Sequence, residues 1–139
     1  MIICDTSGLL AYFDTSDTHC ARVSAVIDAD PGPFVVSPFV IAELDHLLAT
    51  RRGVNAGLTV LTELSGGAWE LPPIDAGDLQ EIRNVVDRYQ DQNIGVADAS
   101  LVLLAHRYRT DRLLSLDRRH FSVIRTATGK AFTVLPEPS

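Results

Sequence analysis

Two aspartates directly follow short apolar runs of the chain. Asp5 comes after residues 1–4, and Asp117 comes after residues 113–116. Runs of this length and composition are expected as buried strands, and the functional side chains of open parallel sheets collect where such strands end. Each aspartate could also simply cap the helix or turn that follows it. On these two segments alone, both roles remain open.

Two further acids lie in segments with helical spacing. Glu43 is one helical turn from both Phe39 and Leu47, so it shares a helix face with apolar neighbours. Asp98 precedes a largely apolar helical segment that has little polar surface of its own. The ordinary alternatives are a surface acid for Glu43 and, for Asp98, a first-turn acid favoured by the helix dipole. If both helices pack against the sheet, their carboxylates can converge with those at the strand ends.

Four carboxylates in one cleft would have a distinctive chemistry. Charges about 4 Å apart repel by roughly 1 kcal/mol per pair in water and several times more in a partly buried cleft, so the group must take up protons or bind a cation. The sequence has no His-x-Glu or Cys-x-x-Cys arrangement that would favour zinc, whereas carboxylate oxygens suit Mg²⁺ or Mn²⁺. Such an ion activates water and stabilises charge on a phosphoryl group. This arrangement favours phosphodiester hydrolysis.

Other polar residues show weaker signals. Asp91 lies in a run of polar residues before Asp98 and is expected to be a loop residue rather than a ligand. The four histidines do not have the spacing of a nucleophile and its base. We therefore expect no catalytic role for any of them.

The elements that must position the four acids alternate along the chain. Short apolar runs are expected as strands at residues 1–4, 34–36, 69–71, 112–116 and 132–135. Helical patterns are expected after residue 8 and at residues 18–28, 38–51, 54–65, 75–91 and 95–108, with a short turn or helix at 117–121. Short strands separated by helices pair in parallel through crossovers. The sequence therefore predicts a three-layer α/β fold with a central, mainly parallel sheet flanked by helices.

Composition and charge restrict the class of protein. A chain of 139 residues with 46% hydrophobic residues can bury the core of one domain, so residues 1–139 are expected as a single domain. No apolar run is long enough for a membrane helix, and two cysteines suggest no disulfide framework, so a cytoplasmic location is expected. The net charge is −6, but residues 107–139 hold 7 basic and 3 acidic side chains. An acidic site beside a basic flank would hold both a cation and an anion.

Four sequence blocks, taken together, resemble a known family. In chain order they are similar to the four motifs of VapC-type PIN domains, toxin ribonucleases of bacterial type II toxin–antitoxin systems. The four blocks are Asp5-Thr6-Ser7-Gly8-Leu9-Leu10, Ser37-Pro38-Phe39-Val40-Ile41-Ala42-Glu43-Leu44, Val96-Ala97-Asp98-Ala99-Ser100-Leu101 and Leu114-Ser115-Leu116-Asp117-Arg118-Arg119-His120-Phe121. Each block alone is weakly specific, but four in order span nearly the whole chain.

The resemblance implies a metal-dependent endoribonuclease with an acidic quartet. In that picture Asp5 and Asp98 are the main ligands of Mg²⁺, with Mn²⁺ as an alternative, while Glu43 and Asp117 hold metal-bound waters or a second ion. The hydroxyl positions that the family places near the site, as supporting or phosphate-contacting groups, are matched by Thr6, Ser7 and Ser115. The resemblance therefore implies that this site hydrolyses phosphodiester bonds of RNA.

The resemblance also implies partners. A homodimer is expected, together with a VapB-type antitoxin whose C-terminal segment covers the active-site groove. Because Arg118 and Arg119 directly follow Asp117, they are the expected RNA phosphate contacts of the basic segment. The alternative is that these two arginines only balance nearby acids.

Two other functions remain open on the sequence. A catalytically silent PIN scaffold that binds RNA or a protein partner is one, although four intact acids argue against it. The other is a haloacid-dehalogenase-like phosphatase, which also opens with a strand that ends in an aspartate. That class expects a second aspartate where Ser7 stands, and a catalytic lysine for which the chain offers only Lys130.

Overall fold

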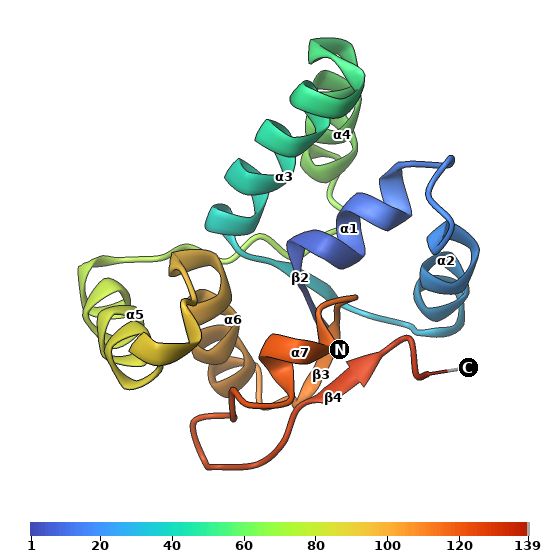
Figure 1. Ribbon diagram of the computed structural model, residues 1–139. Helices are drawn as coiled ribbons and strands as arrows, with labels where there is room; N and C mark the ends of the chain where they lie inside the picture. The colour runs from blue at the N-terminus through green and yellow to red at the C-terminus, as the bar shows by residue number, and fades with distance from the viewer. Residues whose placement is uncertain (139) are drawn as a thin grey trace.

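A four-stranded sheet lies at the centre of the chain (Figure 1). The computed structural model describes residues 1–138. Every ladder between the named strands is parallel, and the order across the sheet is β2-β1-β3-β4. The strands are β1 (Ile2–Cys4), β2 (Phe34–Val36), β3 (Arg112–Leu114) and β4 (Thr133–Leu135). Parallel pairing of β1 with β3 brings Asp5 and Ser115, the residues that follow these strands, to the same edge.

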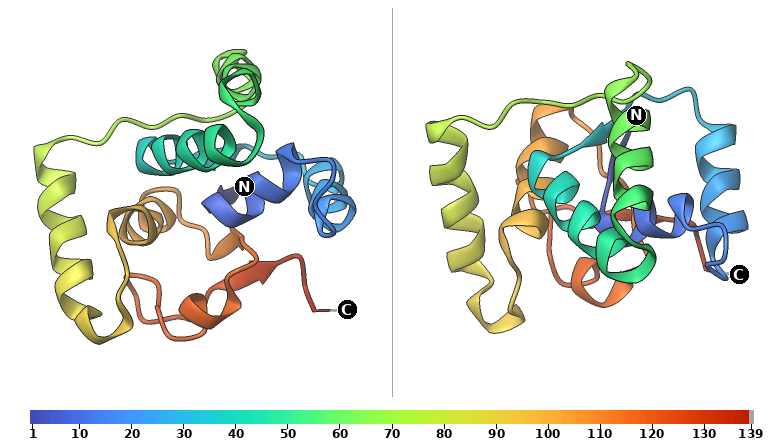
Figure 2. Two further views of the ribbon diagram at one scale, coloured as in Figure 1. Left: turned by 45° about the horizontal axis from the view of Figure 1, so that its top comes forward. Right: turned by 90° about the horizontal axis from the view of Figure 1, so that it is seen from above.

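Helices make up the remaining layers of a three-layer α/β arrangement. They are α1 (Thr6–Phe13), α2 (Cys20–Ala29), α3 (Pro38–Arg52), α4 (Val54–Ser65), α5 (Ala76–Arg88), α6 (Val96–Arg107) and the short α7 (Arg118–Phe121), with a 3-10 turn at Gln90–Gln92. Helix α3 packs on α4, α5 on α6, and α1 on both α2 and α3. Figure 2 shows α2 and α5 on opposite sides of the molecule. The predicted fold class is confirmed.

Helix α1 lies directly against the backbone of β3. At Gly8, an added methyl group would come within 2.7 Å of the carbonyl oxygen of Leu114, so only glycine permits this close approach. The backbone N–H of Asp5 also donates to that carbonyl oxygen at 2.9 Å. The start of α1 is therefore fixed to the end of β3, and Asp5 stands at the junction.

The local sequence explains why α3 begins at Pro38. Ser37 caps the helix by accepting a hydrogen bond from the N–H of Phe39 at 3.2 Å, and Pro38 occupies the first turn. Ser37 is fully buried, and its hydroxyl also accepts a 2.7 Å hydrogen bond from Ser100 on α6. This buried pair joins the helix that carries Glu43 to the helix that carries Asp98.

The prediction of a strand at residues 69–71 is wrong. Glu70 alone pairs with β2, through its N–H to Phe34 and its carbonyl to Val36, both at 2.9 Å. Pro72 and Pro73 follow, and because proline has no N–H the ladder cannot continue. The other predicted strands and helices are present, with ends shifted by a few residues. None of the helices in residues 1–138 combines the length and the apolar character needed to cross a membrane.

Candidate active site

The four predicted acids line one pocket at the carboxyl edge of the sheet. The pocket has a volume of about 390 Å³. Asp5 lies at the start of α1, Glu43 on α3, Asp98 in the first turn of α6, and Asp117 at the start of α7. Four segments that are distant in the sequence therefore each contribute one carboxylate. Asp91 lies in the 3-10 turn and is not among the residues that line this pocket.

Asp5 is the most deeply buried acid of the four, with 5% exposure. Its carboxylate accepts hydrogen bonds from the N–H of Thr6 at 2.8 Å, the hydroxyl of Ser7 at 2.8 Å and the hydroxyl of Ser115 at 2.7 Å. Burial raises the pKa of Asp5, and the three hydrogen bonds oppose that rise. The result is a carboxylate held in one orientation by its neighbours.

The hydroxyls of Ser7 and Ser115 connect Asp5 to the segment that carries Asp117. Ser7 accepts from the N–H of Leu116 at 3.0 Å, and Ser115 accepts from the N–H of Asp117 at 2.9 Å. The two hydroxyl oxygens are 3.2 Å apart. Ser115 thus bonds to both Asp5 and Asp117, and Ser7 bonds to Asp5 and to the residue before Asp117.

Thr6 contributes a different feature. Its side-chain oxygen is buried without a hydrogen-bond partner in residues 1–138, the residue is only 3% exposed, and it lines the pocket. An unpartnered buried hydroxyl is unfavourable unless it gains a partner, such as a ligand oxygen or water.

Asp98 has a pKa well above that of an ordinary aspartate. Burial and the charge of Asp5 raise its pKa to about 6, with smaller contributions from Asp117 and Glu43 and an opposing one from His120. The carboxylates are therefore close enough to disfavour each other's charged forms. Glu43 is the most exposed of the four acids, as expected of a surface acid, although it also lines the pocket.

His120 also lines the pocket, although nothing in the sequence pattern assigned it a role. Its Nδ1 lies 3.0 Å from Oδ2 of Asp117 and 3.5 Å from Oδ2 of Asp98, without hydrogen-bond geometry to either. His120 can form an ion pair with either carboxylate only when its ring is protonated. The one usable signal was its place three residues after Asp117, one turn along α7, which sets both residues on one side of a short helix.

The donor set of the pocket fits a hard divalent cation. All four acids offer carboxylate oxygens, which are the ligands such an ion prefers, and burial together with the charge of Asp5 raises the pKa of Asp98. In the described part of the chain, no three acidic, histidine or cysteine side chains are yet grouped as closely as ligands around one ion.

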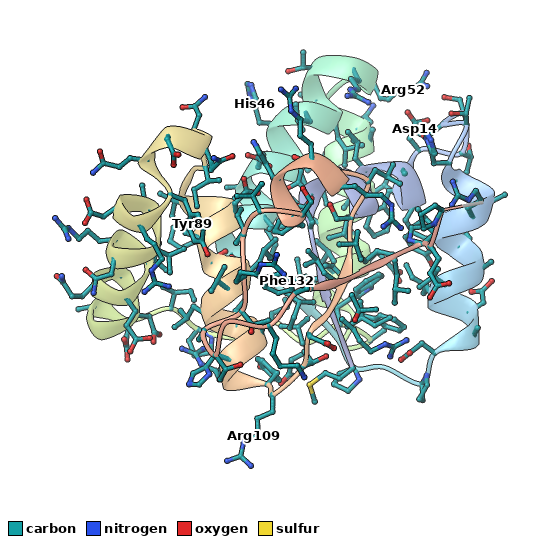
Figure 3. The ribbon with its side chains drawn as sticks, turned by 60° about the horizontal axis from the view of Figure 1, so that its bottom comes forward. Asp14, His46, Arg52, Tyr89, Arg109 and Phe132 are labelled. Atoms are coloured by element: carbon teal, nitrogen blue, oxygen red, sulfur yellow. The ribbon has the colours of Figure 1, made fainter. Side chains whose placement is uncertain are left out.

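The two predicted RNA contacts lie on α7, at the rim of the site. The guanidinium of Arg118 donates to the backbone carbonyls of Val134, at 3.0 Å, and Pro136, so it is held by the segment around β4. Arg119 is exposed. The other lysine and arginine side chains of residues 107–138 do not line this pocket. Among them, Arg109 points away from the body of the molecule (Figure 3).

Comparisons with known proteins agree with this geometry. A family model described as PIN domain matches residues 2–126. Ribonuclease VapC26 of Mycobacterium tuberculosis is 55% identical over 135 residues, which are 97% of this chain and all of that protein. The crystal structure of the sarcin-ricin loop cleaving toxin VapC20 of the same species has a TM-score of 0.81 at 16% identity and covers 88% of this chain and 94% of its own. A toxin–antitoxin complex from Klebsiella pneumoniae has a TM-score of 0.62 at 17% identity and covers 89% of this chain and 92% of its own.

Proposed function

The chain belongs to the PIN-domain family, and on this premise we propose that it is an endoribonuclease and the toxin of a type II toxin–antitoxin pair. The observation that carries the proposal is the single pocket lined by Asp5, Glu43, Asp98 and Asp117. A relative named as a ribonuclease, 55% identical over nearly the whole chain, supports RNA as the substrate.

We propose that this pocket holds Mg²⁺, or Mn²⁺ in its place. Asp5 and Asp98 are the main ligands, and Glu43 and Asp117 hold metal-bound waters or a second ion. When bound, such an ion supplies an activated water and stabilises the negative charge that develops on the phosphoryl group. The protein supplies orientation: Ser7 and Ser115 each donate to Oδ2 of Asp5 and hold it in place.

Thr6, Arg118 and Arg119 are proposed to contact the RNA. The unpartnered hydroxyl of Thr6 is available to a phosphate or water oxygen inside the pocket. The two arginines follow Asp117 directly, where a strand of RNA leaving the pocket would pass. Arg118 would have to leave its two carbonyl partners to take part, so Arg119 is the more accessible contact.

The proposed partners are a second copy of the chain and a VapB-type antitoxin. The toxin–antitoxin complex among the structural neighbours supports a protein inhibitor. A pocket with four carboxylates attracts an arginine or lysine of a partner as readily as it attracts a metal ion. We also propose that residues 1–139 form one domain and act in the cytoplasm, where the free thiols of Cys4 and Cys20 stay reduced.

The Asp98→Asn variant tests the proposed activity. The amide keeps the size of the side chain but removes a ligand charge, so RNA cleavage in Mg²⁺ should fall by at least two orders of magnitude. Asp91→Asn is the matched control, because Asp91 does not line the pocket. EDTA should abolish cleavage by the wild type, and Mg²⁺ should restore it. Equal cleavage by wild type and Asp98→Asn at saturating Mg²⁺ would exclude Asp98 as a ligand, and RNA left uncut by the wild type would favour a silent scaffold.

A further inference from the structure

One face of α3 extends the pocket away from the carboxylates. Glu43, Leu47 and Arg51 are spaced four residues apart, so they lie above one another on the same side of the helix. All three line the pocket. Arg51 is therefore the end of a row that begins at an acid of the proposed catalytic centre.

Arg51 has no partner in residues 1–138 that would hold its charge. No hydrogen bond or ion pair joins its guanidinium to another described side chain, and the residue is exposed. The next residue differs, because Arg52 pairs with Asp14 at 3.1 Å, and Figure 3 shows these two side chains near each other at the far end of α3. Of two adjacent arginines, one is engaged within the protein and the other is available at the pocket.

The charges around the pocket favour Arg51 as a group that binds an RNA phosphate. Besides Arg51, the basic side chain in the described lining is His120, whose Nδ1 lies near the carboxylates of both Asp98 and Asp117. An RNA strand that enters a pocket with four acids needs a cation of the protein for its phosphates. The planar guanidinium of an arginine can donate two parallel hydrogen bonds to two oxygens of one phosphate.

The position of Arg51 on the helix selects which phosphate it can bind. Eight residues separate it from Glu43, which is about 12 Å along the helix axis at 1.5 Å per residue. Metal ligands lie only about 2.1 Å from Mg²⁺, so the scissile phosphate must be next to the carboxylates. We propose that Arg51 is a positioning residue that binds an RNA phosphate flanking the scissile one. This inference rests on the proposed ribonuclease function.

A flanking contact has a kinetic signature that a purely structural role does not produce. It binds ground state and transition state alike, so its loss raises KM and leaves kcat nearly unchanged. It also contributes about 0.7 to the slope of log affinity against log salt for a single strand. Its effect disappears on an RNA too short to carry the flanking phosphate.

The experiment compares Arg51→Ala, Arg51→Lys and the matched control Arg52→Ala. Binding of a mixed-sequence RNA oligonucleotide is titrated from low to moderate salt, with Ca²⁺ replacing Mg²⁺. Cleavage in Mg²⁺ is then measured on RNAs shortened stepwise from either side of the mapped cut. Arg51→Ala should flatten the salt slope by about 0.7 and lower kcat/KM on long RNA about tenfold. Arg51→Lys should keep the slope, and Arg52→Ala should not change it.

The outcomes separate the inference from the function on which it rests. An unchanged salt slope in Arg51→Ala, or an equal loss on the longest and shortest cleavable RNAs, overturns the role of Arg51. If the wild type binds RNA in Ca²⁺ but does not cut it in Mg²⁺, the proposed function fails, and the slopes alone still decide whether Arg51 binds a phosphate. A wild type that does not bind RNA overturns both.

Discussion

The hydroxyl of Ser115 donates to Oδ2 of Asp5 at 2.7 Å, across 110 positions of the chain. This hydrogen bond joins the ends of β1 and β3 and orients the most buried carboxylate of the pocket. Ser115→Ala should lower the free energy of unfolding by about 1–3 kcal/mol, because a buried carboxylate loses a donor. It should also lower cleavage, since Asp5 is no longer held.

Ser122→Ala is the control for that variant. Ser122 also donates a hydrogen bond, to the carbonyl of Arg119 at 2.8 Å, but it is exposed and makes no contact with the acids. Urea denaturation and a cleavage assay on both variants provide the measurement. Equal stability and activity in the two variants would show that Ser115 does not position Asp5.

The raised pKa of Asp98 should make the metal-free protein less stable as the pH rises. Burial and the charge of Asp5 raise this pKa to about 6, whereas an unfolded aspartate titrates near 3.9. Between these values the folded state binds more protons than the unfolded state, so the free energy of unfolding falls with rising pH. Solvent screening reduces the full effect, and we expect a loss of about 1–2 kcal/mol between about pH 4 and pH 7.

Asp98→Asn removes this titration. In EDTA the variant should be more stable than the wild type at about pH 7, and its remaining pH dependence should reflect other acids such as Asp5. Mg²⁺ should reverse the order by stabilising only the wild type. Urea denaturation at several pH values measures both effects, and parallel pH curves for the two proteins would contradict the raised pKa.

Gly8→Ala should push the start of α1 away from β3 and so destabilise the protein. The added methyl group would lie 2.7 Å from the carbonyl oxygen of Leu114, so backbone must move at the point where Asp5 is held. Overpacking of this kind costs about 1–3 kcal/mol, and cleavage should fall as well. Gly77→Ala is the control, because its methyl group meets only the carboxylate of Asp75, at an ordinary 3.5 Å, and alanine favours a helix. A Gly8→Ala protein as stable as Gly77→Ala would show that α1 tolerates the shift.

Inhibition by the proposed antitoxin should compete with Mg²⁺. A cationic side chain of the antitoxin that enters the pocket replaces the charge of the metal ion, so the two cannot be bound together. Raising Mg²⁺ should increase the antitoxin concentration needed for half inhibition in proportion, once salt is held constant. Half inhibition at the same antitoxin concentration, whatever the Mg²⁺ level, would place the inhibitor outside the pocket.

The predictable part of the site consists of residues whose roles follow from local pattern. Asp5 directly follows β1 and Asp117 lies three residues beyond the last residue of β3, so both could be placed at the edge where the parallel strands end. Asp98 and Glu43 followed from helical spacing together with the family motifs. The start of α3 was evident from Ser37 and Pro38, whose chemistry is that of a helix N-terminus.

The remaining features depend on tertiary contacts that local sequence does not encode. His120 becomes part of the site only because α7 turns its side chain towards Asp98 on α6. Arg51 and Arg52 are identical in sequence terms, and only the contact of Arg52 with Asp14 on the loop after α1 distinguishes them. The segment around Glu70 has the composition of a strand, but the prolines that follow limit it to one bridge.

The pairing of β1 with β3 also has a consequence for how the protein is made. During synthesis β1 leaves the ribosome more than 100 residues before β3, so Asp5 is made long before Ser115 and Asp117 exist to complete the pocket. Strand pairing across such a long separation is also intrinsically slow. A nascent or prematurely terminated chain that lacks β3 and α7 therefore carries two of its strands and most of its helices but no complete set of acids. The complete set of acids therefore becomes available only after β3 and α7 have been translated.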